Sequence, residues 1–119
     1  MQLDPAALAA ASAPLNRARS MPAGFYTDPA IFEAERRDIF LKHWFFLCRE
    51  ETLPNNGDYR TFDTPGGPIA LVRGPDGKLR CFANYCRHRG SIMLEGAGNT
   101  GNRIMCPYHA WSYFSDGRL

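Results

Sequence analysis

Two short segments, each carrying one cysteine and one histidine, constrain this sequence of 119 residues more than any other feature. They are Cys86-Arg87-His88 and Cys106-Pro107-Tyr108-His109. Thiolate and imidazole are both ligands for transition metals. Small residues follow each pair, Gly90-Ser91 in the first and Ala110 in the second, and they free the backbone to turn. We therefore expect two tight loops that together form one site with four protein ligands.

The mixed pairs leave two kinds of metal centre open. A structural zinc ion accepts two thiolates and two imidazoles, but its usual spacings pair cysteine with cysteine and histidine with histidine. Two irons suit the pattern better, because one iron can take Cys86 and Cys106 while the other takes His88 and His109. In such a [2Fe–2S] cluster two thiolates cancel the charge of two ferric irons and two sulfides. An electron is then added more easily than to a cluster held by four thiolates.

The remaining cysteines and the third histidine are not expected to be ligands. Cys48 and Cys81 lie in apolar segments, so both are predicted to be buried small hydrophobic residues. His43 follows a predicted helix and is expected on the surface. Gly96, Gly98 and Gly101 match a dinucleotide-binding fingerprint, but no helix is predicted after them, so they indicate a turn.

Charge and hydropathy exclude several classes of protein. Fourteen basic and 12 acidic residues give a net charge of +2, too small for a nucleic-acid-binding footprint. No apolar run approaches the ~18 residues that span a bilayer, so no membrane is expected. Asp4 and Pro5 stand where an export signal carries basic residues. A cytoplasmic location with reduced thiols is therefore predicted.

The chain is predicted to be mainly β, in three successive parts. Residues 1–24 form an arm with one weak Ala-rich helical turn, residues 25–43 a helix segment, and residues 44–119 a small antiparallel β domain. Short runs of β-forming residues separated by Gly- and Pro-rich turns predict the strands. These are Trp44–Cys48, Asp58–Phe62, Ile69–Arg73, Leu79–Ala83, Arg103–Met105 and Trp111–Phe114.

A helix is predicted over Pro29–Leu41. Asp28 can accept hydrogen bonds from the free N–H groups of the first turn, and Pro29 fits the first helical position. Four apolar residues recur at helical spacing and predict one apolar face: Ile31, Phe32, Ile39 and Phe40.

The two loops resemble the signature loops of Rieske non-haem iron oxygenases, the large (alpha) subunits of aromatic-ring-hydroxylating dioxygenases and related monooxygenases. The similarity lies in Asn84–Gly90 and Cys106–Tyr113 and is highly specific. Tyr26–Pro29, Trp44 and the Leu53–Tyr59 region are also similar to that family, although less specifically. The resemblance implies a small antiparallel Rieske iron–sulfur fold preceded by an N-terminal helix.

The resemblance also implies the cofactor and its ligands. Cys86, His88, Cys106 and His109 would bind one [2Fe–2S] cluster, and no catalytic residue is predicted in this chain. The domain would relay electrons, as part of an oxidoreductase, from a reductase or ferredoxin to a mononuclear Fe(II) that activates dioxygen. NAD(P)H would take part only indirectly, through the reductase. The full-length protein is expected to form a ring-shaped homo-oligomer.

That mononuclear iron is expected to lie outside this sequence. Its 2-His-1-carboxylate triad needs two histidines, and only His43 is left. We therefore expect an N-terminal fragment whose α+β catalytic domain is absent, and whose Rieske domain is incomplete at its C-terminus. Two alternatives stay open: a stand-alone Rieske-type ferredoxin and, less favoured, a structural Cys2His2 zinc module. The substrate is not predicted.

Several loop residues have expected roles beside the cluster. Respiratory-chain Rieske subunits join their loops by a disulfide, but the matching positions here are Ser91 and Tyr108. Those subunits also have a serine that bonds a cluster sulfide, where this chain has Trp111, so a low redox potential is expected.

Tyr108 and Trp111 could shield the cluster, and Tyr113 could bond a ligand sulfur. Arg87 and Arg89 could form part of a donor-docking face; ordinary solvated arginines are the alternative.

Overall fold

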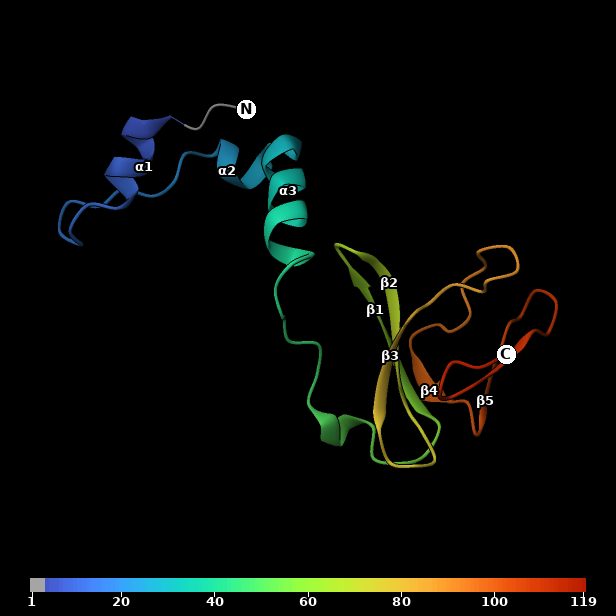
Figure 1. Cartoon of the computed structure of the whole chain (residues 1–119). Helices are drawn as coiled ribbons and strands as arrows, with labels where there is room; N and C mark the ends of the chain where they lie inside the picture. Colours follow the sequence, from blue (N-terminus) through green and yellow to red (C-terminus); the bar gives the residue numbers. More distant parts are fainter. Residues whose placement is uncertain (1–3) are drawn as a thin grey trace. The chain divides into compact units, whose positions relative to one another are not determined.

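The computed structural model describes residues 4–119 and consists of two compact units (Figure 1). The first unit ends at Trp44 and the second extends from Phe45 to Leu119. No helix among the described residues is both long enough and apolar enough to cross a membrane.

The first unit is helical. It contains α1 (Pro5–Ala11), α2 (Gly24–Thr27), α3 (Pro29–Glu35) and a π-helical turn η1 (Arg36–Phe40) that continues α3. Helix α1 begins where the Asp4 carboxylate accepts a hydrogen bond of 2.9 Å from the Ala6 amide. It spans seven residues, so the Ala-rich segment forms more helix than the single weak turn expected.

The predicted start of the longer helix is confirmed. Asp28 Oδ1 accepts a hydrogen bond of 2.8 Å from the Ala30 amide, and Pro29 is the first residue of α3. After Glu35 the turns widen, and the Leu41 amide donates to the Arg36 carbonyl five residues earlier. The expected apolar face is packed only in part. Ile31 is buried, whereas the other three residues of that face are exposed: Phe32, Ile39 and Phe40.

The second unit is built from antiparallel strands, which confirms the mainly β class. A four-stranded sheet has the order β3-β2-β1-β4, and β5 pairs with β6 in a second sheet. The bounds are β1 (Asp58–Thr64), β2 (Gly67–Arg73), β3 (Leu79–Ala83), β4 (Ala97–Asn99), β5 (Arg103–Met105) and β6 (Ser112–Phe114). A short 3-10 helix η2 (Glu50–Thr52) precedes β1. The expected hairpin between β2 and β3 is confirmed, with the Gly77 amide donating to the Gly74 carbonyl.

Two strand predictions differ from the structure. Trp44–Cys48 is not a strand, because no strand among residues 4–119 pairs with its backbone, and its aromatic side chains are exposed. Conversely, β4 lies inside the glycine-rich stretch that was expected to be a turn. Its three residues have no β-forming pattern of their own, and the strand exists because Gly98 pairs with Tyr59 of β1.

The core of the second unit includes two of the predicted ligands. Cys86 and Cys106 are buried together with four other residues: Ala70, Val72, Ile104 and Tyr113. The prediction that Cys81 is buried is wrong, because Cys81 pairs with Leu71 and so lies on the sheet face opposite Ala70 and Val72. Cys48 is half-buried.

Arg73 ties the segment before β1 to the main sheet. Its side chain is only 12% exposed, and its guanidinium donates hydrogen bonds to the carbonyls of Glu50, Leu53 and Gly77. It also forms an ion pair of 2.9 Å with the Glu50 carboxylate. One side chain therefore bonds three backbone carbonyls that lie outside the strands, and the Glu50 carbonyl also accepts the Leu53 amide.

Replacing Arg73 with methionine is expected to lower the free energy of unfolding by about 2–4 kcal/mol, because carbonyls such as that of Leu53 lose their donor. Arg118→Met is the matched control, since Arg118 is exposed and its side chain contacts only its near neighbours in sequence, an ion pair with Asp116 and the Phe114 ring, within the described residues. That control should change the free energy by less than ~1 kcal/mol. Urea denaturation measures both variants, and equal effects would contradict the assigned role.

Candidate metal centre

The two Cys/His loops, residues 86–91 and residues 106–111, have the same backbone turn. The cysteine amide donates to the carbonyl five residues later: Cys86 to Ser91 and Cys106 to Trp111, both at 2.8 Å. In each loop the amide of the fourth residue after the cysteine donates back to the cysteine carbonyl, at 2.8 Å in the first loop and 3.0 Å in the second. The two loops are thus equivalent in structure although their histidine spacings differ.

The turn requires a left-handed residue at its fourth position after the cysteine. Gly90 has φ 69° in the first loop, and Ala110 has φ 60° in the second. A left-handed conformation costs a residue with a Cβ roughly 1–2 kcal/mol, whereas glycine adopts it freely. The second loop therefore carries a strain that the first loop avoids.

All four predicted ligands lie at these loops, with like side chains side by side. The cysteines Cys86 and Cys106 are each only 2% exposed, and both belong to the same buried core cluster. The imidazoles of His88 and His109 are exposed, and their ring centroids lie 4.9 Å apart. Each pair draws one member from each loop. His43, by contrast, is an exposed residue of the helical unit.

The side chain of Tyr113, on β6, contacts the first loop. Its hydroxyl accepts a hydrogen bond of 3.1 Å from the Arg87 amide and lies 3.5 Å from the Cys86 sulfur. Because the amide supplies a proton to the hydroxyl oxygen, the hydroxyl's own proton is available to the sulfur. This bond lowers the pKa of the Cys86 thiol and raises the pKa of the Tyr113 hydroxyl. The expected contact of Tyr113 with a loop cysteine is confirmed, and the sulfur is that of Cys86.

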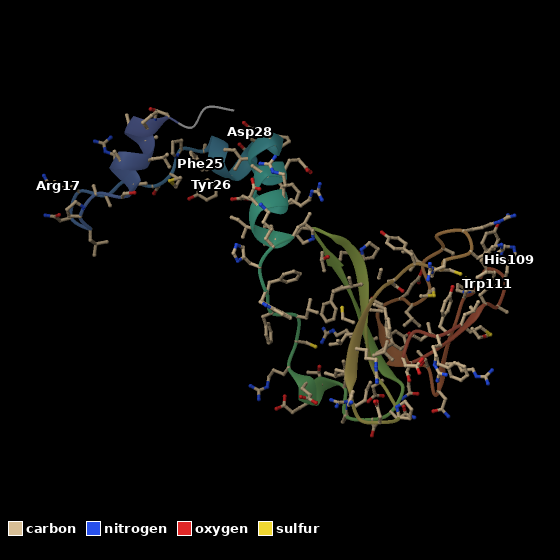
Figure 2. All side chains as sticks on the ribbon, viewed as in Figure 1. Arg17, Phe25, Tyr26, Asp28, His109 and Trp111 are labelled. Carbon is tan, nitrogen blue, oxygen red and sulfur yellow. The ribbon has the colours of Figure 1, made fainter. Side chains whose placement is uncertain are left out.

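An aromatic residue also packs against each imidazole. The Trp111 ring stacks on His88 with centroids 4.9 Å apart and planes 5° apart, and Tyr108 lies 3.9 Å from His109 with a tilt of 34°. Figure 2 shows His109 and Trp111 together at this end of the unit. The shielding that the sequence predicts is partial, because Trp111 is 37% exposed and Tyr108 is 58% exposed.

Asn84 supports the first loop, a role that the sequence analysis missed. It is buried, its side-chain amide donates 2.8 Å to the Leu94 carbonyl, and its side-chain oxygen accepts 3.1 Å from the Leu94 amide. This pair of bonds closes the chain around the loop. Its position just before Tyr85-Cys86 was visible in the sequence, but nothing there indicates a partner ten residues later.

A comparison with known families gives one match that covers most of the chain. Residues 43–119 match the Rieske [2Fe-2S] domain. The chain belongs to the Rieske family.

Curated relatives place this Rieske domain among oxygenase subunits. It is 46% identical over 100 residues to the carnitine monooxygenase oxygenase subunit of Escherichia coli K12, covering 84% of this chain and 27% of the relative. It is 42% identical over 100 residues to the glycine betaine monooxygenase oxygenase subunit of Chromohalobacter salexigens, covering 84% and 22%. The chain thus spans about a quarter of the length of these relatives.

Solved structures agree with this placement. The quaternary ammonium Rieske monooxygenase CntA, in complex with gamma-butyrobetaine, aligns with a TM-score of 0.80 and 42% identity, over 86% of this chain and 29% of that chain. Naphthalene 1,2-dioxygenase from Rhodococcus sp. aligns with a TM-score of 0.73 and 35% identity, over 82% and 22%. The predicted Rieske fold is therefore confirmed.

The donor set suits the cofactor of this family. Two adjacent buried thiols and two adjacent exposed imidazoles form two pairs, as a cluster with one sulfur-ligated and one nitrogen-ligated iron requires. Among residues 4–119 no three or more His, Cys, Asp or Glu side chains gather where one ion could sit. Since the relatives are oxygenase subunits, neither the zinc module nor the separate ferredoxin is favoured.

Exchanging the residues at the left-handed position tests the equivalence of the loops. Ala110→Gly should raise the free energy of unfolding by about 0.5–1 kcal/mol, because the relief of strain exceeds the entropy cost of glycine. Gly90→Ala should lower it by roughly 1–2 kcal/mol, since no atom lies within 4 Å of the added Cβ and only strain is introduced. Thermal or urea unfolding measures both; equal signs for the two variants would contradict the shared turn.

Tyr113→Phe tests the bond to the ligand sulfur. A hydrogen bond to sulfur favours the reduced state of a cluster, so its loss should lower the midpoint potential by roughly 30–60 mV, which corresponds to about 1 kcal/mol. Tyr59→Phe is the control, because the Tyr59 hydroxyl bonds the Glu95 carbonyl instead. Redox titration of the cluster-loaded protein distinguishes them, and an unchanged midpoint in Tyr113→Phe would disprove the assignment.

Proposed function

We propose that this chain binds one [2Fe–2S] cluster through Cys86, Cys106, His88 and His109, and that it is the electron-transfer domain of an oxygenase subunit. One observation carries the ligand assignment: two equivalent turns bring the two thiols together in the core and the two imidazoles together at the surface. Cysteines then hold the inner iron and histidines hold the outer iron.

The cysteines are buried and the histidines are exposed, and this difference determines on which side of the cluster electrons enter and leave. When bound, the cluster accepts one electron and passes one on. Cys86 and Cys106 sit among core residues and keep water from the inner side of the site. His88 and His109 are exposed, so a partner protein can approach the imidazole edge and accept a hydrogen bond from a free ring N–H. Electrons therefore enter and leave at the histidine end.

The electron donor is a reductase or a ferredoxin with an acidic docking face. Arg87 and Arg89 flank His88, are exposed, and form no ion pair within the described residues. Unpaired positive charge beside an exposed ligand favours encounter with a negatively charged partner. NAD(P)H supplies the electrons indirectly, through that partner.

The electron acceptor is a mononuclear non-haem iron that activates dioxygen for monooxygenation or dioxygenation. Such an iron needs two histidines and a carboxylate. The three histidines of this chain do not suffice once two of them hold the cluster. The acceptor thus lies elsewhere in the subunit or in a neighbouring one. Inter-subunit electron transfer is described for one solved relative, the quaternary ammonium Rieske monooxygenase, which supports an acceptor in a neighbouring subunit. We infer a homo-oligomer in which the subunits form a ring.

Iron and acid-labile sulfide analysis with histidine variants tests the proposal. The unmodified protein should contain about two irons and two sulfides per chain and give an EPR signal on reduction. His88→Cys should keep the cluster but lower its midpoint by on the order of 100 mV, because a third thiolate adds negative charge. His43→Ala should change neither. One zinc per chain without sulfide, or an unshifted midpoint in His88→Cys, would refute the proposal.

The midpoint potential of the unmodified protein is expected below zero, near the lower end of the Rieske range of about −150 to +300 mV. Trp111 stands at the position where respiratory-chain Rieske subunits have a serine that bonds a cluster sulfide. Its indole ring carries no hydroxyl, so this bond, which would favour the reduced cluster, is missing. Titration with redox dyes, followed by visible absorption, measures this value. A midpoint well above zero would contradict the expectation.

A further inference from the structure

Trp111 links the two loops through both its backbone and its side chain. Its carbonyl accepts the Cys106 amide and closes the second loop, while its ring stacks on His88 of the first loop at 4.9 Å and 5°. One residue thus belongs to the turn of one loop and to the ligand environment of the other.

No disulfide among the four cysteines joins the two loops. The four cysteines are all free thiols, so the loops are held together by non-covalent contacts between side chains. Within the described residues these contacts include the Tyr113 hydroxyl on Cys86, the edge contact between the two imidazoles, and the Trp111 ring on His88. Of these, Tyr113 acts on the sulfur side, and Trp111 acts on the imidazole side without being a ligand itself.

The stacking geometry restricts the orientation of the His88 ring. A histidine bound through one nitrogen can still rotate about the metal–nitrogen bond. His88 has a parallel ring, Trp111, against one face and the edge of His109, inclined by 64°, as its other aromatic neighbour. Rotation of His88 would break the parallel contact with Trp111. His109 has a looser support, because Tyr108 is tilted by 34° and belongs to the same loop.

We propose that Trp111 is a positioning residue that clamps the first loop to the second and fixes the plane of the His88 imidazole. This inference rests on the proposed ligand set. It assigns the two histidines different degrees of restraint: His88 is held by a ring from the opposite loop, and His109 by a ring from its own loop.

The test is pulsed EPR of the reduced, cluster-loaded full chain labelled with ¹⁵N-histidine. In the unmodified protein two histidine nitrogens should couple to the cluster. In Trp111→Leu one coupling, that of His88, should shift or broaden while the other persists. Trp111→Phe keeps a flat ring and should restore the native coupling. Tyr108→Leu should affect the other histidine, and Trp44→Leu, at an exposed tryptophan of the helical unit, should affect neither.

A second readout is the rate at which a chelator removes iron. Trp111→Leu should lose its cluster about threefold to tenfold faster than the unmodified protein, with Trp111→Phe close to native. If Trp111→Leu folds but retains no cluster while Tyr108→Leu and Trp44→Leu load normally, the clamp is supported. If Trp111→Leu does not fold, Trp111→Ala and Trp111→Phe carry the comparison.

Native couplings and native loss rates in the variants without a ring at position 111 would overturn the inference. The proposed function fails in a different way, since an unmodified protein without two coupled histidine nitrogens would refute the ligand set whatever Trp111 does.

Discussion

The paired hydrogen bonds that close each Cys/His loop are the constraint on which the site depends. They tie the backbone of Cys86 and Cys106 into identical turns, so the two thiols point into the core and the two histidines emerge at the surface. A cluster with sulfur ligands on one iron and nitrogen ligands on the other fits this separation of cysteines from histidines.

The rest of the unit supports those turns from several directions. Tyr113 on β6 bonds the Cys86 sulfur and the Arg87 amide, and Asn84 closes the first loop by bonding Leu94. Away from the loops, Arg73 bonds carbonyls of Glu50, Leu53 and Gly77. Loss of Tyr113 or Asn84 would leave polar groups beside the first loop without a partner, whereas loss of Arg73 would act on the stability of the unit.

Most strands were predicted from the sequence because they depend on local patterns, and the proposed ligands were identified in the same way. Mixed Cys/His pairs and short β-forming runs between turns are visible within a few residues, and Asp28 with Pro29 marks a helix start. The equivalence of the loops was not visible, because C-x-H and C-x-x-H differ in spacing although their backbone bonds agree. Strand β4 was missed since it depends on pairing with β1, 35 or more residues away in the chain.

Other predictions failed because burial is decided by tertiary structure. The aromatic run Trp44–Cys48 has the composition of a strand but no partner strand. Cys81 pairs with Leu71, whose side chain points to the face of the sheet opposite the core residues Ala70 and Val72. The bond from Tyr113 to Cys86 joins residues 27 apart and could be proposed from sequence, but only the fold brings the hydroxyl to the sulfur.

In the proposed site the cysteines hold one iron and the histidines hold the other. Mössbauer spectroscopy of the protein loaded with ⁵⁷Fe tests it most directly, since the signal of each iron reports its own ligands. Two signals of equal area are expected, and on reduction the nitrogen-ligated iron alone should become ferrous. Two indistinguishable irons, or an electron localised on the sulfur-ligated iron, would contradict it.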